Sequence, residues 1–160
     1  MKAPSIYVDM DGVLVDFLKG YKELTGKHLE SPSETTKKGK ELIQDSPDYW
    51  ESLSKTADCD SLWNYIKKYN PKILTANPIW DDSAEKGKFK WIEKHCPVPK
   101  KDFYCVPRQD KQIFAKINGH QNILIDDYIK NCKEWEDKGG IAIQHKNAKE
   151  TIIRLKLLGL

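Results

Sequence analysis

Short apolar segments that alternate with amphipathic stretches restrict the possible folds of this sequence more than any other feature. Five such segments are rich in β-branched or aromatic residues and cover positions 5–9, 72–75, 103–106, 122–126 and 141–144. Helical patterns occur at positions 61–69, 83–95, 111–117, 128–138 and 148–158. Strands that are apolar almost throughout and are separated by helices are typical of a parallel sheet covered on both faces. The sequence therefore predicts an α/β fold with a Rossmann-like parallel sheet.

The spacing between the first two predicted strands is unusually long. Roughly sixty residues separate them, which is more than one crossover helix needs. We therefore predict a small helical cap at positions 17–70, inserted into a core formed by positions 1–16 and 71–160. Positions 31–40 of this cap are polar and rich in lysine, and we expect a mobile loop there.

Composition argues against several classes of partner. The chain of 160 residues has 27 basic and 24 acidic residues, and only Arg108 and Arg154 are arginines. Arginine is the residue that pairs bidentately with bases and phosphates, so duplex nucleic acid is not an expected partner. No segment has the ~18 consecutive apolar residues of a membrane span, and no apolar leader follows Met1. We expect a cytoplasmic protein whose four cysteines, which lack the CxxC spacing of a zinc site, stay reduced.

Polar side chains stand at the ends of three predicted strands. Asp9 and Asp11 follow the first strand, Thr75 ends the second, and Asp126 and Asp127 end the fourth. The carboxyl ends of parallel strands share one edge of a sheet, and functional groups gather there. The fold would thus bring four carboxylates and a hydroxyl together.

Crowded carboxylates repel one another, so a bound cation is the simplest way to neutralise them. Magnesium prefers oxygen ligands and is commonly held by one or two carboxylates together with a substrate phosphate. No histidine or cysteine stands beside these aspartates, which argues against zinc. We therefore predict a Mg²⁺ cofactor near Asp9, Asp126 and Asp127.

An aspartate beside a divalent cation can attack a phosphate ester and form a covalent aspartyl-phosphate. Asp9 fits that role. Asp11, two residues further on, can protonate the leaving oxygen if Gly12 lets the chain turn sharply after the strand. Thr75 and a lysine would hold the transferred phosphoryl oxygens.

These motifs, in their order and spacing, resemble those of haloacid dehalogenase-type phosphatases. Within that superfamily the chain is most similar to the 5'(3')-deoxyribonucleotidases and their short bacterial and phage relatives. The resemblance covers nearly the whole chain. The stretches that carry it are DMDGVL at 9–14, DYWESL at 48–53, LTANP at 74–78, EK at 85–86 with Trp91, Lys111, and LIDD at 124–127.

The resemblance implies a role for most of these residues. Asp9 would be the nucleophile and a metal ligand, while Asp11 would act as general acid and then base and give its backbone carbonyl to the metal. Asp127 would bind the metal directly, with Asp126 behind it. Asn131 stands where other members have a further acid. The residues expected to bind the phosphoryl group are Thr75, Ala76, Lys86 and Lys111.

Several substrates remain open. The subgroup resemblance implies a nucleoside monophosphate, above all a deoxyribonucleotide, with Tyr49 and Trp50 stacking on the base. Either aromatic residue can instead be part of the cap core. A sugar phosphate or the 3'-phosphate end of a nucleic acid would need the same chemistry, and a non-catalytic binding module with this fold is a third alternative. The sequence does not indicate an oligomeric state.

Overall fold

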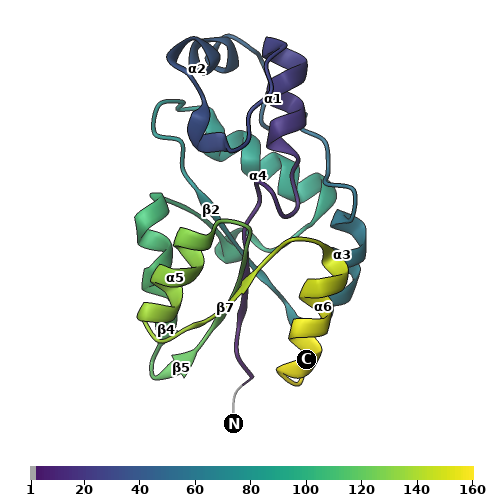
Figure 1. The fold of residues 1–160 in the computed structure, drawn as a ribbon, viewed down its shortest axis with the longest axis vertical. Coiled ribbons are helices and arrows are strands. Elements are labelled where there is room, and N and C mark those ends of the chain that lie inside the picture. Colours follow the sequence, from purple (N-terminus) through teal and green to yellow (C-terminus); the bar gives the residue numbers. More distant parts are fainter. Residues whose placement is uncertain (1–2) are drawn as a thin grey trace.

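The computed structural model describes residues 3–160 and has a five-stranded parallel sheet at its centre (Figure 1). The strand order is β3-β2-β1-β6-β7, so the first strand of the chain lies in the middle of the sheet. The predicted α/β class and the five predicted strands are confirmed, with small shifts at their ends. The strands are Ile6–Val8 (β1), Lys72–Ala76 (β2), Phe103–Val106 (β3), Ile123–Asp126 (β6) and Ile141–Gln144 (β7).

The strands distribute their side chains between two separate hydrophobic layers. Ile6, Val8 and Ile73 belong to one layer, whereas Tyr7 and Leu74 belong to the other. Successive residues of a strand point to opposite faces, and here both faces are covered. This is why the strand segments are apolar at nearly every position rather than at every second one.

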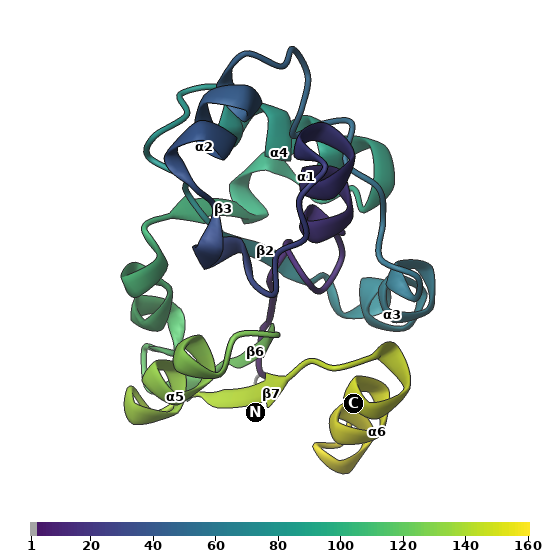
Figure 2. The ribbon, with the colours of Figure 1, turned by 45° about the horizontal axis from the view of Figure 1, so that its top comes forward.

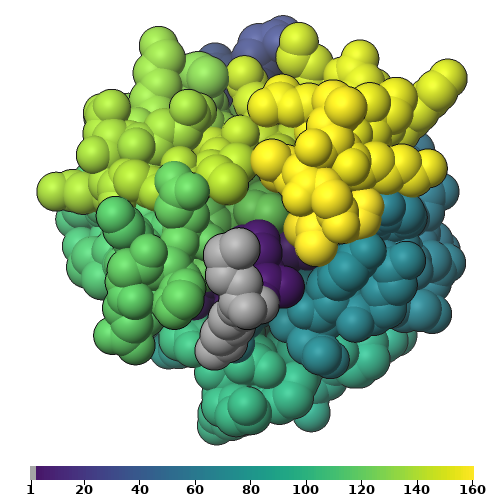
Figure 3. Space-filling model, turned by 90° about the horizontal axis from the view of Figure 1, so that it is seen from below, coloured from purple at the N-terminus to yellow at the C-terminus, as the bar shows by residue number. Residues whose placement is uncertain are grey.

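Helices cover both faces of the sheet. α5 packs against β7 and the 3-10 helix η4 on one face, while α3 and α6 pack against each other on the opposite face. The view from below shows α6, in yellow, directly beside the teal segment that contains α3 (Figure 3). No helix within residues 3–160 is long and apolar enough to cross a membrane. The bounds are Cys59–Ile66 (α3), Ala84–His95 (α4), Arg108–Phe114 (η4), Ile129–Asp137 (α5) and Ala148–Leu157 (α6).

Two helices of the insertion after β1 lie above the carboxyl edge of the sheet (Figure 2). They are α1 (Phe17–Thr25) and α2 (Lys37–Gln44), which pack against each other. Gly39 allows this approach, because a Cβ at that position would lie 2.1 Å from the hydroxyl of Tyr21. The cap at positions 17–70 stays a prediction as a unit, with α1 and α2 as the part that overlies the sheet edge.

The segment at positions 31–40 forms two helical pieces, so the expectation of a loop there was wrong. Ser31 and Glu34 make a reciprocal capping box around the 3-10 helix η1 (Pro32–Glu34). Thr36 caps α2 by accepting a hydrogen bond from the Gly39 N–H at 3.0 Å. These side chains accept hydrogen bonds from backbone N–H groups of the first helical turn, which have no partner within the helix. The polar composition of the segment thus reflects capping.

The prediction for positions 111–117 was also partly wrong. The helix there is η4, which starts earlier and is a 3-10 helix, and a short hairpin follows it. The hairpin joins β4 (Lys116–Ile117) to β5 (His120–Gln121). Asn118 and Gly119 have φ values of +52° and +79°, as a two-residue hairpin turn requires. The Asn-Gly pair is the sequence signal for this turn, and the prediction of a helix up to position 117 did not take it into account.

Candidate active site

Asp9, Asp126 and Asp127 meet at the carboxyl edge of the sheet, where β1 and β6 lie side by side. Asp9 continues β1, and its backbone N–H donates to the carbonyl of Ile125 at 2.9 Å. Asp126 ends β6, and Asp127 follows it. One carboxylate oxygen of each of the three acids lies within 4.8 Å of the others. The pairing of two parallel strands therefore brings these acids together.

Burial and crowding raise the pKa values in this cluster. Burial, and next the negative charge of Asp126, raise the pKa of Asp9 well above its ordinary range, although Lys111 opposes the shift. The same two causes raise the pKa of Asp127 to about 6. The cluster therefore has a strong affinity for protons or for another cation.

Lys111 supplies a buried positive charge to the cluster. Its ammonium donates to Asp9 Oδ1 and to Asp126 Oδ2, both at 2.9 Å, and only 2% of the residue is exposed. Burial alone would lower the pKa of Lys111, but the two carboxylates outweigh burial and hold it above its ordinary range. The structure thus places a charged lysine on the expected nucleophile.

The turn after β1 brings Asp11 to the same edge. Three successive backbone N–H groups after Gly12 donate to the carbonyl of Met10, at 2.8 to 3.1 Å. Gly12 has a φ of +86°, and a Cβ there would lie 2.1 Å from Asp127 Oδ2. Both the backbone conformation and the contact exclude a side chain at this position.

Lys88 is a site residue that the sequence analysis missed. It is 2% exposed, and its ammonium donates to Thr75 Oγ1 at 2.8 Å and to Asp11 Oδ2 at 3.0 Å. The expected lysine was Lys86, which instead lines a separate cavity of about 210 Å³. The available signal was helical periodicity: the buried residues of α4 are Ala84, Lys88, Trp91 and Ile92. A lysine on the buried face of a helix needs a charged or polar partner.

Tyr49 and Trp50 are buried beneath α1. The Trp50 indole stacks on Phe17, with ring centroids 5.9 Å apart and an interplanar angle of 28°, and its N–H donates to Asp81 at 2.8 Å. The Tyr49 hydroxyl has no hydrogen-bond partner among residues 3–160. Both residues line the smaller cavity that contains Lys86, and neither lines the larger cavity next to Asp9 and Asp127 at the carboxyl edge of the sheet.

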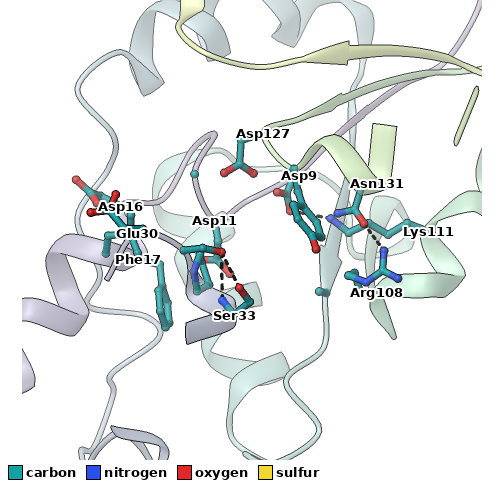
Figure 4. Close-up of a pocket in the computed structure, with 16 residues that line it drawn as sticks. Asp9, Asp11, Asp16, Phe17, Glu30, Ser33, Arg108, Lys111, Asp127 and Asn131 are labelled. Atoms are coloured by element: carbon teal, nitrogen blue, oxygen red, sulfur yellow. Dashed lines mark hydrogen bonds and ion pairs between the residues drawn. The ribbon is translucent and has the colours of Figure 1, made fainter. Parts of the chain in front are cut away.

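A cavity of about 560 Å³ opens between the sheet edge and the cap (Figure 4). Its sheet side includes the four groups Asp9, Asp11, Asp127 and Lys111, with Ala76 from the end of β2. Phe17, Leu18 and positions 30–33 form its cap side. In Figure 4 the acids Asp16 and Glu30 lie on the side opposite Lys111 and Arg108.

Searches of protein-family models and of curated protein sequences find no match to this chain. Solved structures do match its fold. A hydrolase from Streptococcus pneumoniae TIGR4 aligns with a TM-score of 0.52 and 11% identity over 100% of both chains. A HAD family hydrolase from Deinococcus radiodurans R1, solved with bound phosphate and sodium, aligns with a TM-score of 0.52 and 14% identity over 88% of this chain and 80% of its own. A candidate β-phosphoglucomutase from Thermotoga maritima aligns with a TM-score of 0.50 and 14% identity, over 91% of this chain and 88% of its own.

The chain has the haloacid dehalogenase fold. The resemblance inferred from the motifs is confirmed at that level, while the deoxyribonucleotidase subgroup stays a prediction. In this haloacid dehalogenase fold the four aspartates, Thr75 and the two buried lysines occupy one edge of the sheet.

Proposed function

We propose that this chain is a magnesium-dependent phosphomonoesterase that transfers the phosphoryl group of its substrate to Asp9. The observation that carries the proposal is that Asp9 and Asp11 line one cavity and that each is paired with a buried lysine, Asp9 with Lys111 and Asp11 with Lys88. Carboxylates alone would repel a phosphate ester. Buried ammonium groups beside them supply the positive charge that a dianionic phosphoryl group needs.

The donor set at the sheet edge fits magnesium. Three carboxylates with oxygens within 4.8 Å of one another are hard ligands, and the pKa values of Asp9 and Asp127 are raised by burial and then by the negative charge of Asp126, which a bound cation would offset. Asp9, Asp127 and the backbone carbonyl of Asp11 would hold the ion, with Asp126 behind them. When bound, Mg²⁺ would neutralise charge on these acids and on the substrate phosphate.

In the first half of the proposed reaction, a carboxylate oxygen of Asp9 attacks phosphorus while the bond to the leaving oxygen breaks. Asp11 donates its proton to that oxygen, so the alcohol leaves in neutral form. In the second half, Asp11 takes a proton from water as the water attacks the aspartyl-phosphate. Inorganic phosphate is released and Asp9 is restored.

Lys88, Lys111 and Thr75 are the groups that we propose hold the phosphoryl oxygens. The two ammonium groups each contact one of the reacting acids, so they are already close to the phosphoryl position. The Thr75 hydroxyl, fully buried, accepts its hydrogen bond from Lys88 and can donate its own proton onward. Because these donors are fixed before the substrate binds, little reorganisation is needed during transfer.

We further propose a nucleoside monophosphate as the substrate, with α1 and α2 acting as the cap. The cavity volume lies within the roughly 300–1,000 Å³ that small-molecule sites span. Its cap side offers Phe17, Leu18 and Pro32, and Tyr128 lies on the sheet side, so apolar and aromatic surfaces flank the space next to the acids. Such surfaces suit the flat faces of a nucleobase better than a sugar.

Trp50 is buried behind Phe17 and does not line the cavity, so Phe17 is the residue to substitute in a test of base stacking. Phe17→Leu should lower kcat/KM for a nucleoside monophosphate about tenfold to a hundredfold, because base stacking contributes roughly 1–3 kcal/mol per base. It should leave p-nitrophenyl phosphate little changed. Phe89→Leu, at a half-buried phenylalanine of α4 that packs against Phe103 of β3 and does not line the cavity, serves as the matched control.

Phosphate release from a panel of phosphorylated metabolites decides the wider question. A preference for sugar phosphates over every nucleotide would overturn the nucleotide proposal and leave the phosphatase standing. Activity on nucleic-acid 3'-phosphate ends alone would have the same effect. No phosphate release from any monoester, with magnesium present, would favour a binding module.

A further inference from the structure

A chain of hydrogen bonds leads from α5 to Asp9. Arg108 Nη1 donates to Asn131 Oδ1 at 2.7 Å, and Asn131 Nδ2 donates to Asp126 Oδ2 at 3.1 Å. The same Asp126 oxygen accepts a hydrogen bond from Lys111, whose ammonium also reaches Asp9 Oδ1. Figure 4 shows Arg108, Asn131 and Lys111 grouped on one side of Asp9.

Arg108 is anchored before any substrate arrives. It is the first residue of η4, and its guanidinium pairs with Glu134 on α5 at 3.0 Å. The guanidinium also lies 6.0 Å from the ring centroid of Tyr128. An arginine that bridges two elements in this way holds its planar fork in one orientation.

The two ends of the Asn131 side chain face opposite charges. Its carbonyl oxygen points to the positive guanidinium of Arg108, and its NH₂ group points to the negative carboxylate of Asp126. A rotation of the amide by half a turn would place like charges together at both ends. The electrostatics therefore fix the orientation of this amide, and Arg108 supplies half of that constraint.

We propose that Arg108 is a positioning residue of the phosphatase reaction, acting through Asn131 and Asp126 on Lys111. Asp126 is completely buried, and its Oδ2 has two donors, Asn131 and Lys111. If the Asn131 amide turned away, Lys111 would be the remaining donor to that oxygen and would shift toward Asp126 and away from Asp9. The phosphoryl-binding ammonium would then be misplaced. This inference rests on the proposed function.

The first test compares Arg108→Met and Arg108→Lys with the wild type on p-nitrophenyl phosphate and on a nucleoside monophosphate. Arg108→Met should lower kcat about tenfold to a hundredfold on both substrates, with KM changed by less than about twofold, because a misplaced binding group affects the transition state most. Arg108→Lys should lose less of its kcat, since lysine keeps the positive charge but lacks the planar, forked guanidinium. Arg154→Met, at the exposed other arginine on α6, should behave as wild type.

A double-mutant cycle with Asn131→Leu distinguishes positioning from a general loss of structure. Since Arg108 acts through Asn131, adding Arg108→Met to Asn131→Leu should cost less than about threefold more in kcat. Losses that multiply, or a kcat unchanged in Arg108→Met, would overturn the inference. So would a rise in KM confined to the nucleotide, which would make Arg108 a substrate contact.

Two controls keep these outcomes interpretable. If Arg108→Met does not fold by circular dichroism, Glu134→Gln removes the negative charge of the anchor and keeps the guanidinium, and it should give the same pattern with a smaller loss of kcat. A wild-type protein that releases no phosphate from these two substrates or from any monoester of the metabolite panel would overturn the proposed function and this inference together. A normal wild type with unaffected variants would overturn the inference alone.

Discussion

Asp127→Asn should stabilise the metal-free protein at pH 8. The pKa of Asp127 is raised from the ordinary 3.8 to about 6 by burial and then by Asp126. The folded protein therefore holds this proton more tightly than the unfolded chain does, and the contribution of Asp127 to the free energy of unfolding falls as the pH rises from about 4 to about 6. Above that window the ionised carboxylate destabilises the fold. An uncharged amide removes this effect.

The size of the effect follows from the shift. About two pKa units correspond to about 3 kcal/mol, and partial exposure of the side chain reduces this to about 1–2 kcal/mol through screening. In a domain of this size, that difference should raise Tm by about 3–6 °C in chelator at pH 8. Near pH 4 the difference should vanish, because the wild-type acid is then protonated in the folded protein.

Thermal unfolding in EDTA across pH 4 to 8 measures this difference, with the exposed Asp82→Asn as the control. In excess Mg²⁺ the wild type should instead be more stable than Asp127→Asn. The ion stabilises the wild type by about 2.7 kcal/mol at a hundred times its Kd, and it should bind the variant poorly. A variant less stable than wild type at pH 8 in EDTA would refute the electrostatic argument. Equal stabilisation of both proteins by Mg²⁺ would refute Asp127 as a ligand.

Three further results are expected from the site. Asp9→Asn should abolish phosphate release while the circular dichroism spectrum stays unchanged, since the amide keeps the shape but loses the nucleophile; near wild-type turnover would exclude the mechanism. Phosphate release should stop in excess EDTA and return with Mg²⁺, whereas full activity in chelator or stoichiometric zinc would contradict the metal assignment. In an assay of phosphate release from p-nitrophenyl phosphate, Lys88→Met should lower kcat/KM by at least about a hundredfold, whereas Lys86→Met should change kcat/KM by less than about twofold. Similar losses in both variants would contradict the placement of Lys88 in the site.

Sequence patterns were sufficient to predict the sheet and the acids at its edge. The five strands of the central sheet are short and mostly apolar, and helical patterns separate them, so the sequence predicts a parallel sheet. Functional groups gather at the carboxyl ends of parallel strands, which predicts that Asp9 and Asp126 converge. Gly12 was predicted on the same grounds, because a sharp turn after β1 requires it. These features depend on local order along the chain.

The lysine and the aromatic residues were harder to place because their positions depend on packing between segments. Lys86 and Lys88 are two residues apart on α4, and only the orientation of that helix against the sheet decides which one is buried. In the same way, nothing local indicates that Phe17 stands between Trp50 and the cavity. The apolar residues of α4 mark the face that buries Lys88, whereas the position of Phe17 depends on how α1 packs against other segments, which periodicity along the sequence does not encode.

The central position of β1 has a consequence for how the protein folds. β1 is the first strand to be synthesised, yet one of its two neighbours is β6, and Lys111 meets Asp9 across 102 positions of the chain. Contacts between such distant segments incur a large loss of chain entropy before they form, so folding should be slow for a domain of this length. Until β6 has been synthesised, one edge of β1 exposes unpaired backbone groups next to an apolar surface. The nascent chain is therefore most vulnerable to aggregation before the synthesis of β6, the strand that brings Asp126 beside Asp9.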